Sequence, residues 1–449
     1  MSFSPVLSDF PEGQSSSCQA GQPTSAHDVD DRSACALHPV RRHKQQRSMR
    51  VLYLTHRLPY APNRGDRVRS YQTLRALRRC VKVDVVSLVH DGAELAQVGR
   101  VRELADHVDL APVTRIRNFA AGVFRLPTAT PLTHVLLHSP AMPALLRRIV
   151  AERRPDVVLA YCTGMARFAF GPELTGLPVV LDMVDVDSVK WKSLADRSTA
   201  PMRWIYGREA TRLAAFEAEA VQRAVATIVV NDRERTALQS IVPNAPVEVM
   251  PNGVDSQFFK PAPTEHATSD VVFCGVMNYP PNEAGALWLA RDIWPRVRQQ
   301  CKEARLWLVG SQPTMRVSGL ARDPSINVTG AVSDVRPFLW RSAIAVAPLK
   351  TARGVQTKVL EAVASGLPTI VTSAVAEGLP PEILAACRVA DTTETFTDGI
   401  VEYLRLEARA RRALAEHVNL QLFSWDRCLA KLVTLLESAA QREGEPAIR

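Results

Sequence analysis

The residues of this chain best suited to chemistry lie in the segment that begins at Arg353. Apolar side chains recur there at helical spacing, which predicts a helix over residues 355–365 after a loop at Gly354. The start of such a helix directs N–H groups and the positive end of its dipole toward an anion. Arg353 and Lys358 add positive charge, and Glu361, one turn after Lys358, adds a hydroxyl acceptor. Phosphate-binding groups beside a hydroxyl acceptor predict a nucleotide site.

A second candidate segment, Pro62-Asn-Arg-Gly-Asp-Arg67, follows the first expected strand. Gly65 lets the backbone approach a phosphate or a sugar closely. We expect the flanking Arg64, Arg67 and Arg69 to be within reach of a donor diphosphate or an anionic acceptor. The alternative interpretation is a plain strand-to-helix turn with solvated arginines.

Three carboxylates, Asp182, Asp185 and Asp187, cluster at the end of another expected strand. Carboxylates at this spacing are typical of a metal site, but also of contacts to an acceptor or of loop caps. We favour the second interpretation and expect no metal. Asp182 is the candidate for contact with an acceptor or a reacting sugar hydroxyl, and Asp185 is expected to line the cleft.

The elements that must position these residues alternate between strands and helices twice along the chain. Short apolar runs predict two series of buried strands, at 51–55, 83–89, 108–112, 157–162, 179–183 and 226–230, and then at 271–275, 305–309, 326–329, 344–347, 369–372 and 387–390. Helices are expected between them, at 67–79, 141–152, 203–223, 283–300, 334–341, 355–365 and 394–418. This pattern predicts an α/β protein with two tandem domains, each built on a parallel, doubly wound sheet. Such domains bind ligands at the carboxyl ends of their strands.

The 449 residues divide into a tail and two domains. Residues 1–48 are rich in Ser, Gln, Asp and Pro without periodicity, and we expect them to be disordered. The first domain is predicted at 49–245, joined by a terminal helix at 426–441, and the second at 246–425.

Composition favours an ordinary globular protein of the cytoplasm. Hydrophobic residues make up 46% and charged residues 22% of the chain. No apolar run reaches the roughly 18 residues that span a bilayer, and we expect no secretory signal. The eight cysteines are scattered without a Cys-x-x-Cys pair, which argues against a zinc site or a disulfide framework.

Positive charge is concentrated in the first predicted domain. Residues 49–245 carry 28 basic and 19 acidic residues, a net charge of +9, whereas the flanking stretches are balanced. Nucleic acid is one interpretation, but aromatic residues are few and no nucleic-acid-binding motif is present. Peripheral contact with the anionic inner face of the cell membrane, or an anionic acceptor, fits better. Residues 115–125 are a candidate for this contact, although a solvated helix is an equal alternative.

The order of motifs resembles the GT-B glycosyltransferases of family 4. The matching strings are Asn63-Arg-Gly-Asp66, Pro251-Asn-Gly-Val-Asp255, Leu308-Val-Gly310, Val328-Thr-Gly330 and Lys358-Val-Leu-Glu-Ala-Val-Ala-Ser-Gly366. More narrowly, the chain resembles the sugar transferases of PEP-CTERM/exosortase exopolysaccharide systems. This narrower likeness rests on Arg57-Leu-Pro-Tyr60, Asp182-Met-Val-Asp-Val-Asp-Ser188, Gly275-Val-Met-Asn-Tyr-Pro-Pro-Asn282 and Ala352-Arg-Gly-Val-Gln356. Each string is weak alone, and their collective order is specific.

The resemblance implies roles for particular residues. Glu361 matches the second acid of the family's Glu–seven residues–Glu signature, which holds the ribose hydroxyls. Arg353 stands where the family has the first acid, which contacts the donor sugar. We therefore expect Arg353 and Lys358 to supply the positive charges that hold the donor diphosphate. Together with Asp182, they are the expected catalytic residues. The donor nucleotide is expected at Gly275, Gly310, Gly354, Val355, Gln356, Thr357 and Glu361.

The implied reaction transfers a sugar from a nucleoside-diphosphate sugar to an acceptor hydroxyl, with retention and without a cofactor. The acceptor is expected to be a lipid-linked glycan or a growing polysaccharide. Two alternatives stay open at this point. One is a GT-B nucleotide-sugar epimerase, and the other is a non-catalytic nucleotide-sugar-binding protein, motivated by the missing first acid.

Overall fold

The computed structural model describes residues 48–61, 65–262 and 268–441, and the described residues from Met49 onward belong to one unit. The tail predicted for residues 1–48 lies outside the described residues, apart from Ser48. Arg64 lies outside them as well.

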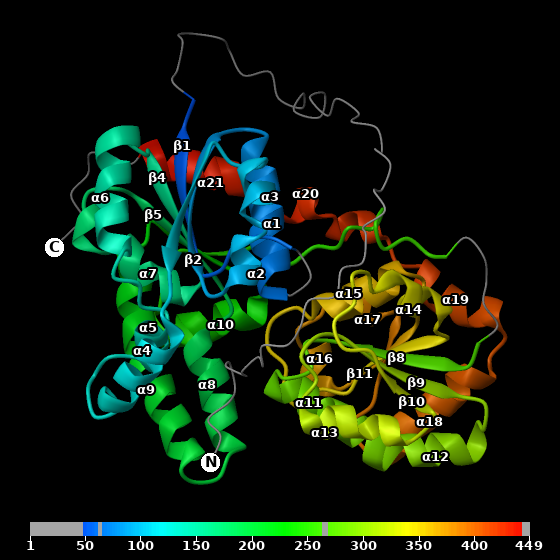
Figure 1. The fold of residues 1–449 in the computed structure, drawn as a ribbon. Coiled ribbons are helices and arrows are strands. Elements are labelled where there is room, and N and C mark those ends of the chain that lie inside the picture. The colour runs from blue at the N-terminus through cyan, green and yellow to red at the C-terminus, as the bar shows by residue number, and fades with distance from the viewer. Residues whose placement is uncertain (1–47, 62–64, 263–267, 442–449) are drawn as a thin grey trace, which may run out of the picture. The chain divides into compact units, whose positions relative to one another are not determined.

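The first sheet has seven parallel strands in the order β3-β2-β1-β4-β5-β6-β7 (Figure 1). Five of the six residues of the central strand β1 are buried, because a parallel sheet is covered on both faces. Val51 of β1 lies opposite Val83 on one side and Val157 on the other. The strands are β1 (Arg50–Thr55), β2 (Lys82–Val89), β3 (His107–Pro112), β4 (Val157–Tyr161), β5 (Val179–Val184), β6 (Ala226–Val229) and β7 (Val247–Val249).

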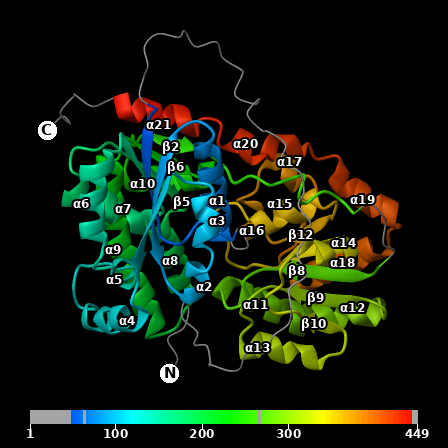
Figure 2. The same cartoon turned by 45° about the horizontal axis from the view of Figure 1, so that its top comes forward.

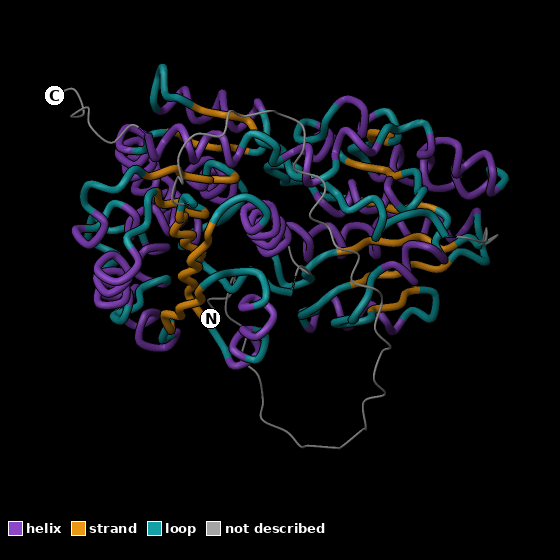
Figure 3. Tube along the Cα trace, turned by 90° about the horizontal axis from the view of Figure 1, so that it is seen from above, coloured by secondary structure: helices purple, strands orange, loops and turns teal. Residues whose placement is uncertain are grey.

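Helices flank the strands of this sheet on either side (Figure 3). They are α1 (Gly65–Arg78), α2 (Gly92–Leu95), α3 (Val98–Arg102), α4 (Arg115–Phe124), α5 (Leu132–Leu136), α6 (Met142–Arg153), α7 (Thr163–Ala169), η1 (Pro172–Leu174), α8 (Asp187–Asp196), α9 (Met202–Arg223) and α10 (Asp232–Ile241). β7 completes this first sheet, so the boundary predicted after residue 245 precedes the last strand of the sheet.

The second sheet has six parallel strands in the order β10-β9-β8-β11-β12-β13. Its strands are β8 (Asp270–Cys274), β9 (Arg305–Val309), β10 (Ile326–Val328), β11 (Ile344–Ala347), β12 (Thr369–Val371) and β13 (Cys387–Val389). Its helices are α11 (Pro280–Trp288), η2 (Leu289–Ile293), α12 (Trp294–Gln300), α13 (Met315–Ser318), η3 (Gly319–Arg322), α14 (Arg336–Arg341), α15 (Thr357–Ala364), α16 (Ser373–Ala376), α17 (Pro381–Leu384), α18 (Thr393–Arg405) and α19 (Ala408–Glu416). The two-sheet α/β architecture predicted from the sequence is confirmed.

Two long predicted helices are interrupted. The helix expected over 283–300 contains the π-helical turn η2, which is followed by Trp294 and then Pro295. Proline has no N–H and its ring clashes with the preceding turn, so the helix widens there instead of continuing. The helix expected over 394–418 divides into α18 and α19, because Leu406 and Glu407 adopt extended backbone conformations.

The chain then returns to the first sheet. η4 (Leu420–Phe423), α20 (Trp425–Cys428) and α21 (Leu432–Gln441) follow α19. Leu432, Leu436 and Ala439 of α21 are buried in the core that contains Val51 and Leu159 of the first sheet (Figure 2). The predicted return of the terminal helix to the first domain is therefore confirmed. No helix in the described part of the chain is long and apolar enough to cross a membrane.

Candidate functional site

The helix α15 has the start and stop expected from its sequence. Gly354, in the loop before it, has a positive φ of 61°, which glycine adopts without strain. Gly366, just after it, has φ 79°, the left-handed conformation that ends many helices. The residues that anchor the helix in the second core are Val359, Leu360, Val363 and Ala364. The free N–H groups of the first turn of α15 point along the helix axis, toward the loop that contains Gly354.

Lys358 is held at a fixed position beside the end of β8. Its Nζ donates to Oδ1 of Asn282 at 2.7 Å, and Nδ2 of Asn282 in turn donates to the carbonyl of Val276 at 2.9 Å. A Cβ atom at Gly275 would lie 3.2 Å from Nζ and 2.8 Å from Nδ2 of Asn282, so the glycine leaves the room that these groups occupy. Burial lowers the pKa of Lys358 to about 8.

Gly310, after β9, packs directly against this position. Its φ is 146°, and a Cβ atom there would lie 1.8 Å from the carbonyl oxygen of Gly275. No other residue fits without movement of the backbone. The structure therefore brings together Gly275, Gly310 and Lys358, three of the residues assigned to the donor site.

Glu361 lies one turn after Lys358 on α15. Burial raises its pKa to about 7, and the nearby Lys358 opposes that rise. Since Asn282 accepts the hydrogen bond of Lys358, the carboxylate of Glu361 is not needed to hold the lysine in place. This arrangement suits Glu361 for accepting hydrogen bonds from ribose hydroxyls.

Arg353 is joined to the first half of the chain. Its Nη2 lies 2.9 Å from Oε1 of Glu234, a buried carboxylate in the first turn of α10. Oε2 of Glu234 accepts from the backbone N–H of Val186 at 2.9 Å. The two predicted cations thus have different partners: Lys358 donates to Asn282, and Arg353 forms an ion pair with Glu234.

Asp185 lies against the loop that precedes α15. A Cβ atom at Gly354 would lie 2.1 Å from Oδ1 of Asp185, and this oxygen is buried without a hydrogen-bond partner among the described residues. The preceding Val184 has φ 67°, which strains a β-branched residue and turns the chain where the strand register shifts. Burial, and next the charge of Glu234, raise the pKa of Asp185 to about 7.

Asp182 occupies a different place from the one predicted. Its two carboxylate oxygens accept from Nε and Nη2 of Arg69, at 2.9 and 3.2 Å. Nη1 of Arg69 also donates to the carbonyl of Met250 and to Oδ1 of Asn252. Both partners are almost fully buried, so this geometry gives Asp182 a structural role rather than the expected contact with an acceptor.

The other predicted residues have local partners. Arg67 pairs with Glu94 at 2.6 Å, and Gly65 is the first residue of α1. The side chain of Gln356 donates to the carbonyl of Arg353 at 2.9 Å. The carbonyl of Val355 lies 3.5 Å from Nδ2 of Asn252, and Thr357 is the first residue of α15. Within the described ranges, no group of three or more His, Cys, Asp or Glu side chains is arranged to hold a metal ion.

Two further residues of this site, Asn282 and Glu234, were missed by sequence reasoning. Asn282 stands in the string Gly275–Asn282 that carried the resemblance, so its position could have drawn attention. Glu234 gives no such signal, because an acid in the first turn of a helix is commonplace.

Two family models match the chain. The model described as "Glycosyl transferase 4-like domain" matches residues 64–253, and the one described as "Glycosyl transferases group 1" matches residues 268–405. No curated protein sequence matches the chain.

Solved structures share the fold at low identity. HepE from Anabaena, in complex with UDP and glucose, has a TM-score of 0.62 at 12% identity and covers 87% of this chain and 100% of its own. Sucrose-phosphate synthase from Thermosynechococcus elongatus has a TM-score of 0.61 at 13% identity over 87% and 98% of the two chains. WaaG, a glycosyltransferase involved in lipopolysaccharide biosynthesis, has a TM-score of 0.55 at 16% identity over 88% and 100%. Each half of the chain therefore matches a glycosyltransferase family model, and the chain shares the two-domain fold of these solved structures.

Proposed function

We propose that this protein transfers a sugar from a nucleoside-diphosphate sugar to an acceptor hydroxyl. The observation that carries the proposal is the position of Lys358, which Asn282 holds beside Gly275 at the start of α15. A cation and a helix start at one place form a diphosphate site, and Glu361 adds the acceptor for ribose hydroxyls.

A UDP-sugar is the first donor to test. Structures of HepE contain UDP, UDP-glucose, or UDP and glucose, which supports a donor of this class. A hexose is the proposed transferred group.

The chemistry needs charge stabilisation on the leaving diphosphate more than it needs a strong base. Lys358 and the N–H groups of α15 supply it, and Arg353 joins them when it leaves Glu234. The C1–O bond to the diphosphate breaks, the C1–O bond to the acceptor forms on the same face, and the acceptor proton passes to a leaving phosphate oxygen. We propose this retaining route, without a divalent metal, because Arg353 replaces the acid expected there.

The acceptor we propose is a lipid-linked glycan or a growing polysaccharide, in exopolysaccharide synthesis of the PEP-CTERM/exosortase type. Two observations support it. The structural neighbour WaaG is involved in lipopolysaccharide biosynthesis, and the excess positive charge of residues 49–245 favours contact with the anionic inner membrane.

The test uses the purified full chain, a panel of nucleotide sugars, and membranes as acceptor, with and without EDTA. Transfer to the membrane fraction that persists in EDTA, and is lost in Lys358→Met, would support the proposal. Isomerisation of the donor without acceptor would instead identify an epimerase. Tight nucleotide-sugar binding without turnover would identify a binding protein.

A further inference from the structure

Helix α4 buries a polar and a small residue and exposes apolar ones, the reverse of an ordinary surface helix. The residues it buries are Asn118 and Gly122, whereas Ile116 is 87%, Phe124 81% and Val123 52% exposed. We call Ile116, Val123 and Phe124 the α4 apolar face. A helix on a globular protein normally turns its apolar side toward the core, so an exposed face of this kind marks an interaction site.

Specific contacts fix this orientation of α4. Nδ2 of the buried Asn118 donates to the carbonyls of Leu136 and His138, at 3.0 and 2.7 Å. At the other end of the buried side, a Cβ atom at Gly122 would just touch the side chain of Leu136, at 4.0 Å. Rotation of the helix to bury Phe124 would break both amide hydrogen bonds and leave the carbonyls of Leu136 and His138 without this donor.

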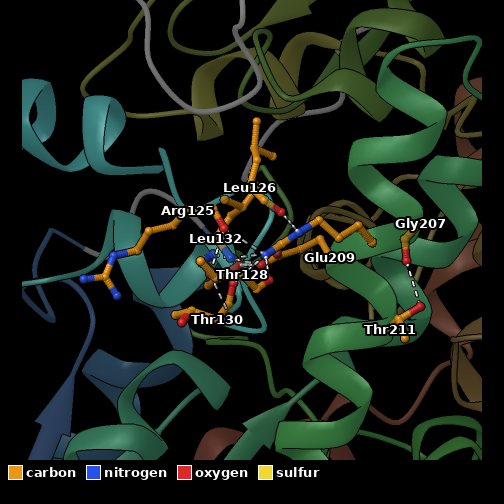
Figure 4. Close-up of polar contacts among 10 residues, drawn as sticks. Arg125, Leu126, Thr128, Thr130, Leu132, Gly207, Glu209 and Thr211 are labelled. Carbon is orange, nitrogen blue, oxygen red and sulfur yellow. Dashed lines mark hydrogen bonds and ion pairs between the residues drawn. The ribbon is translucent and has the colours of Figure 1, made fainter. Parts of the chain in front are cut away.

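The end of α4 is tied to α9. The guanidinium of Arg208 donates to the carbonyls of Arg125 at 3.2 Å, Leu126 at 2.5 Å and Thr130 at 2.9 Å, while Glu209 accepts from the N–H of Leu132 at 2.7 Å (Figure 4). This network holds the loop after α4 against one side of α9.

One turn before Arg208 on α9 is Trp204, which is 60% exposed. It borders an open depression of about 450 Å³ along α9, lined by Ala200, Arg203, Trp204, Gly207, Arg208 and Thr211. Because Arg208 binds the carbonyl of Arg125, the residue that follows α4, Trp204 lies one helical turn from the contact that joins the end of α4 to α9. Tryptophan is enriched where proteins meet the headgroup region of a bilayer.

The charge within the stretch that contains α4 has one sign. Residues 110–151 contain no Asp or Glu, and Arg117 and Arg125 are exposed beside the apolar side chains. An isologous contact between two copies of this stretch would bring the positive charges of one copy close to those of the other, which is unfavourable. An anionic lipid surface offers both the apolar interior and the negative charge that this surface lacks.

We infer that α4 is an interfacial anchor, which lies in the plane of an anionic bilayer with the α4 apolar face inserted among the acyl chains. This inference deepens the proposed function, on which it rests for its purpose of bringing the enzyme to a membrane-held acceptor. Binding to lipid does not itself depend on transfer.

The test is co-sedimentation of the full chain with vesicles of phosphatidylcholine alone and of phosphatidylcholine with phosphatidylglycerol in equal parts. We expect binding only to the anionic vesicles, and at least a roughly tenfold weaker partition for Ile116→Ser/Phe124→Ser, since buried apolar area sets much of such binding. Arg117→Glu should weaken binding as well, most strongly at low salt.

Matched controls come from the second half of the chain. Met315 is 92% exposed and Arg322 is exposed, so Met315→Ser and Arg322→Glu should leave vesicle binding unchanged. Equal binding by wild type and Ile116→Ser/Phe124→Ser, or no binding by wild type, would overturn the inference. So would a concentration-dependent dimer that the double substitution abolishes, because the face would then join two copies. Vesicle binding without any sugar transfer would sink the proposed function and leave the anchor standing.

Discussion

Nη2 of Arg353 lies 2.9 Å from Oε1 of Glu234, so the cation at the start of the α15 loop is held by a carboxylate from the other half of the chain. A donor diphosphate and Glu234 would therefore compete for the same guanidinium. The hydrogen-bond acceptor of Lys358 is instead the neutral Asn282, although the charge of Glu361 also acts on this lysine.

Removal of Arg353 should weaken donor binding. We expect Arg353→Ala to raise the Kd for UDP about tenfold, since charge-assisted bonds of this kind contribute about 1.5 kcal/mol or more. Glu234→Gln should tighten binding by a few fold, because it frees the guanidinium. Isothermal titration of both variants and of the double variant checks this. An Arg353→Ala enzyme with unchanged UDP affinity would refute the assignment of Arg353 to the diphosphate.

Lys358 should govern both the rate and its pH dependence. We expect Lys358→Met to lower kcat by about 10²-fold, the usual effect of losing one preorganised charge at a developing anion. With a pKa of about 8, Lys358 is charged below that pH and loses its proton above it, so kcat/KM for the donor should fall as pH rises through about 8. The alkaline limb should vanish from the profile of Lys358→Met. Asn282→Ala should lower kcat less than Lys358→Met does and should keep measurable activity.

Glu361 should recognise the ribose. We expect Glu361→Ala to bind UDP about tenfold more weakly than the wild type does. The variant should bind UDP and its 2′,3′-dideoxy analogue equally well, because it lacks the carboxylate that would accept hydrogen bonds from the ribose hydroxyls. The wild type should bind UDP more tightly than the dideoxy analogue. Competition assays with the two nucleotides measure the difference, and a Glu361→Ala variant that still discriminates between them would exclude this role.

Asp185 should make the stability fall with rising pH. Its pKa in the fold is raised to about 7, so the folded protein holds a proton that the unfolded chain, with an ordinary aspartate pKa, has lost. The stabilisation is complete below about pH 4 and is lost as pH rises through about 7. Asp185→Asn should remove this slope and be more stable than wild type above pH 7, by on the order of 2 kcal/mol. Urea unfolding at pH 5 and pH 8 tests the sign, and parallel pH curves for the two proteins would contradict it.

Arg69 should be needed for folding rather than for chemistry. We expect Arg69→Met to destabilise the protein by about 3–5 kcal/mol, because it leaves the carboxylate of Asp182 buried and unpaired. Arg69→Met/Asp182→Leu should recover much of that loss. Denaturant unfolding measures both. If Asp182→Asn folded with normal stability yet transferred no sugar, Asp182 would be catalytic as the sequence first suggested.

The order of strands and helices could be predicted because parallel strands buried on both faces leave near-continuous apolar runs, as in Val51–Thr55. The convergence of Gly275, Gly310 and Lys358 could be predicted too, since the carboxyl ends of parallel strands meet at one edge. The division between α18 and α19 could not, because neither Leu406 nor Glu407 is a residue that breaks helices.

The polar pairs of the site could not be predicted from the sequence, for a different reason. Arg69 and Asp182 are separated by 113 positions, and the first domain offers 28 basic residues as partners for its 19 acids. Spacing along the chain cannot select among them, since the choice depends on which side chains the sheets bury. The same holds for Arg353 and Glu234.

The return of α21 to the first sheet has a consequence for biosynthesis. Leu432, Leu436 and Ala439 complete a core whose strands begin at Arg50, so the first half cannot reach its final packing until the ribosome has translated the entire second half. During that interval its apolar surface needs protection by chaperones, and excision of the first half as an independent fragment should yield an aggregating polypeptide.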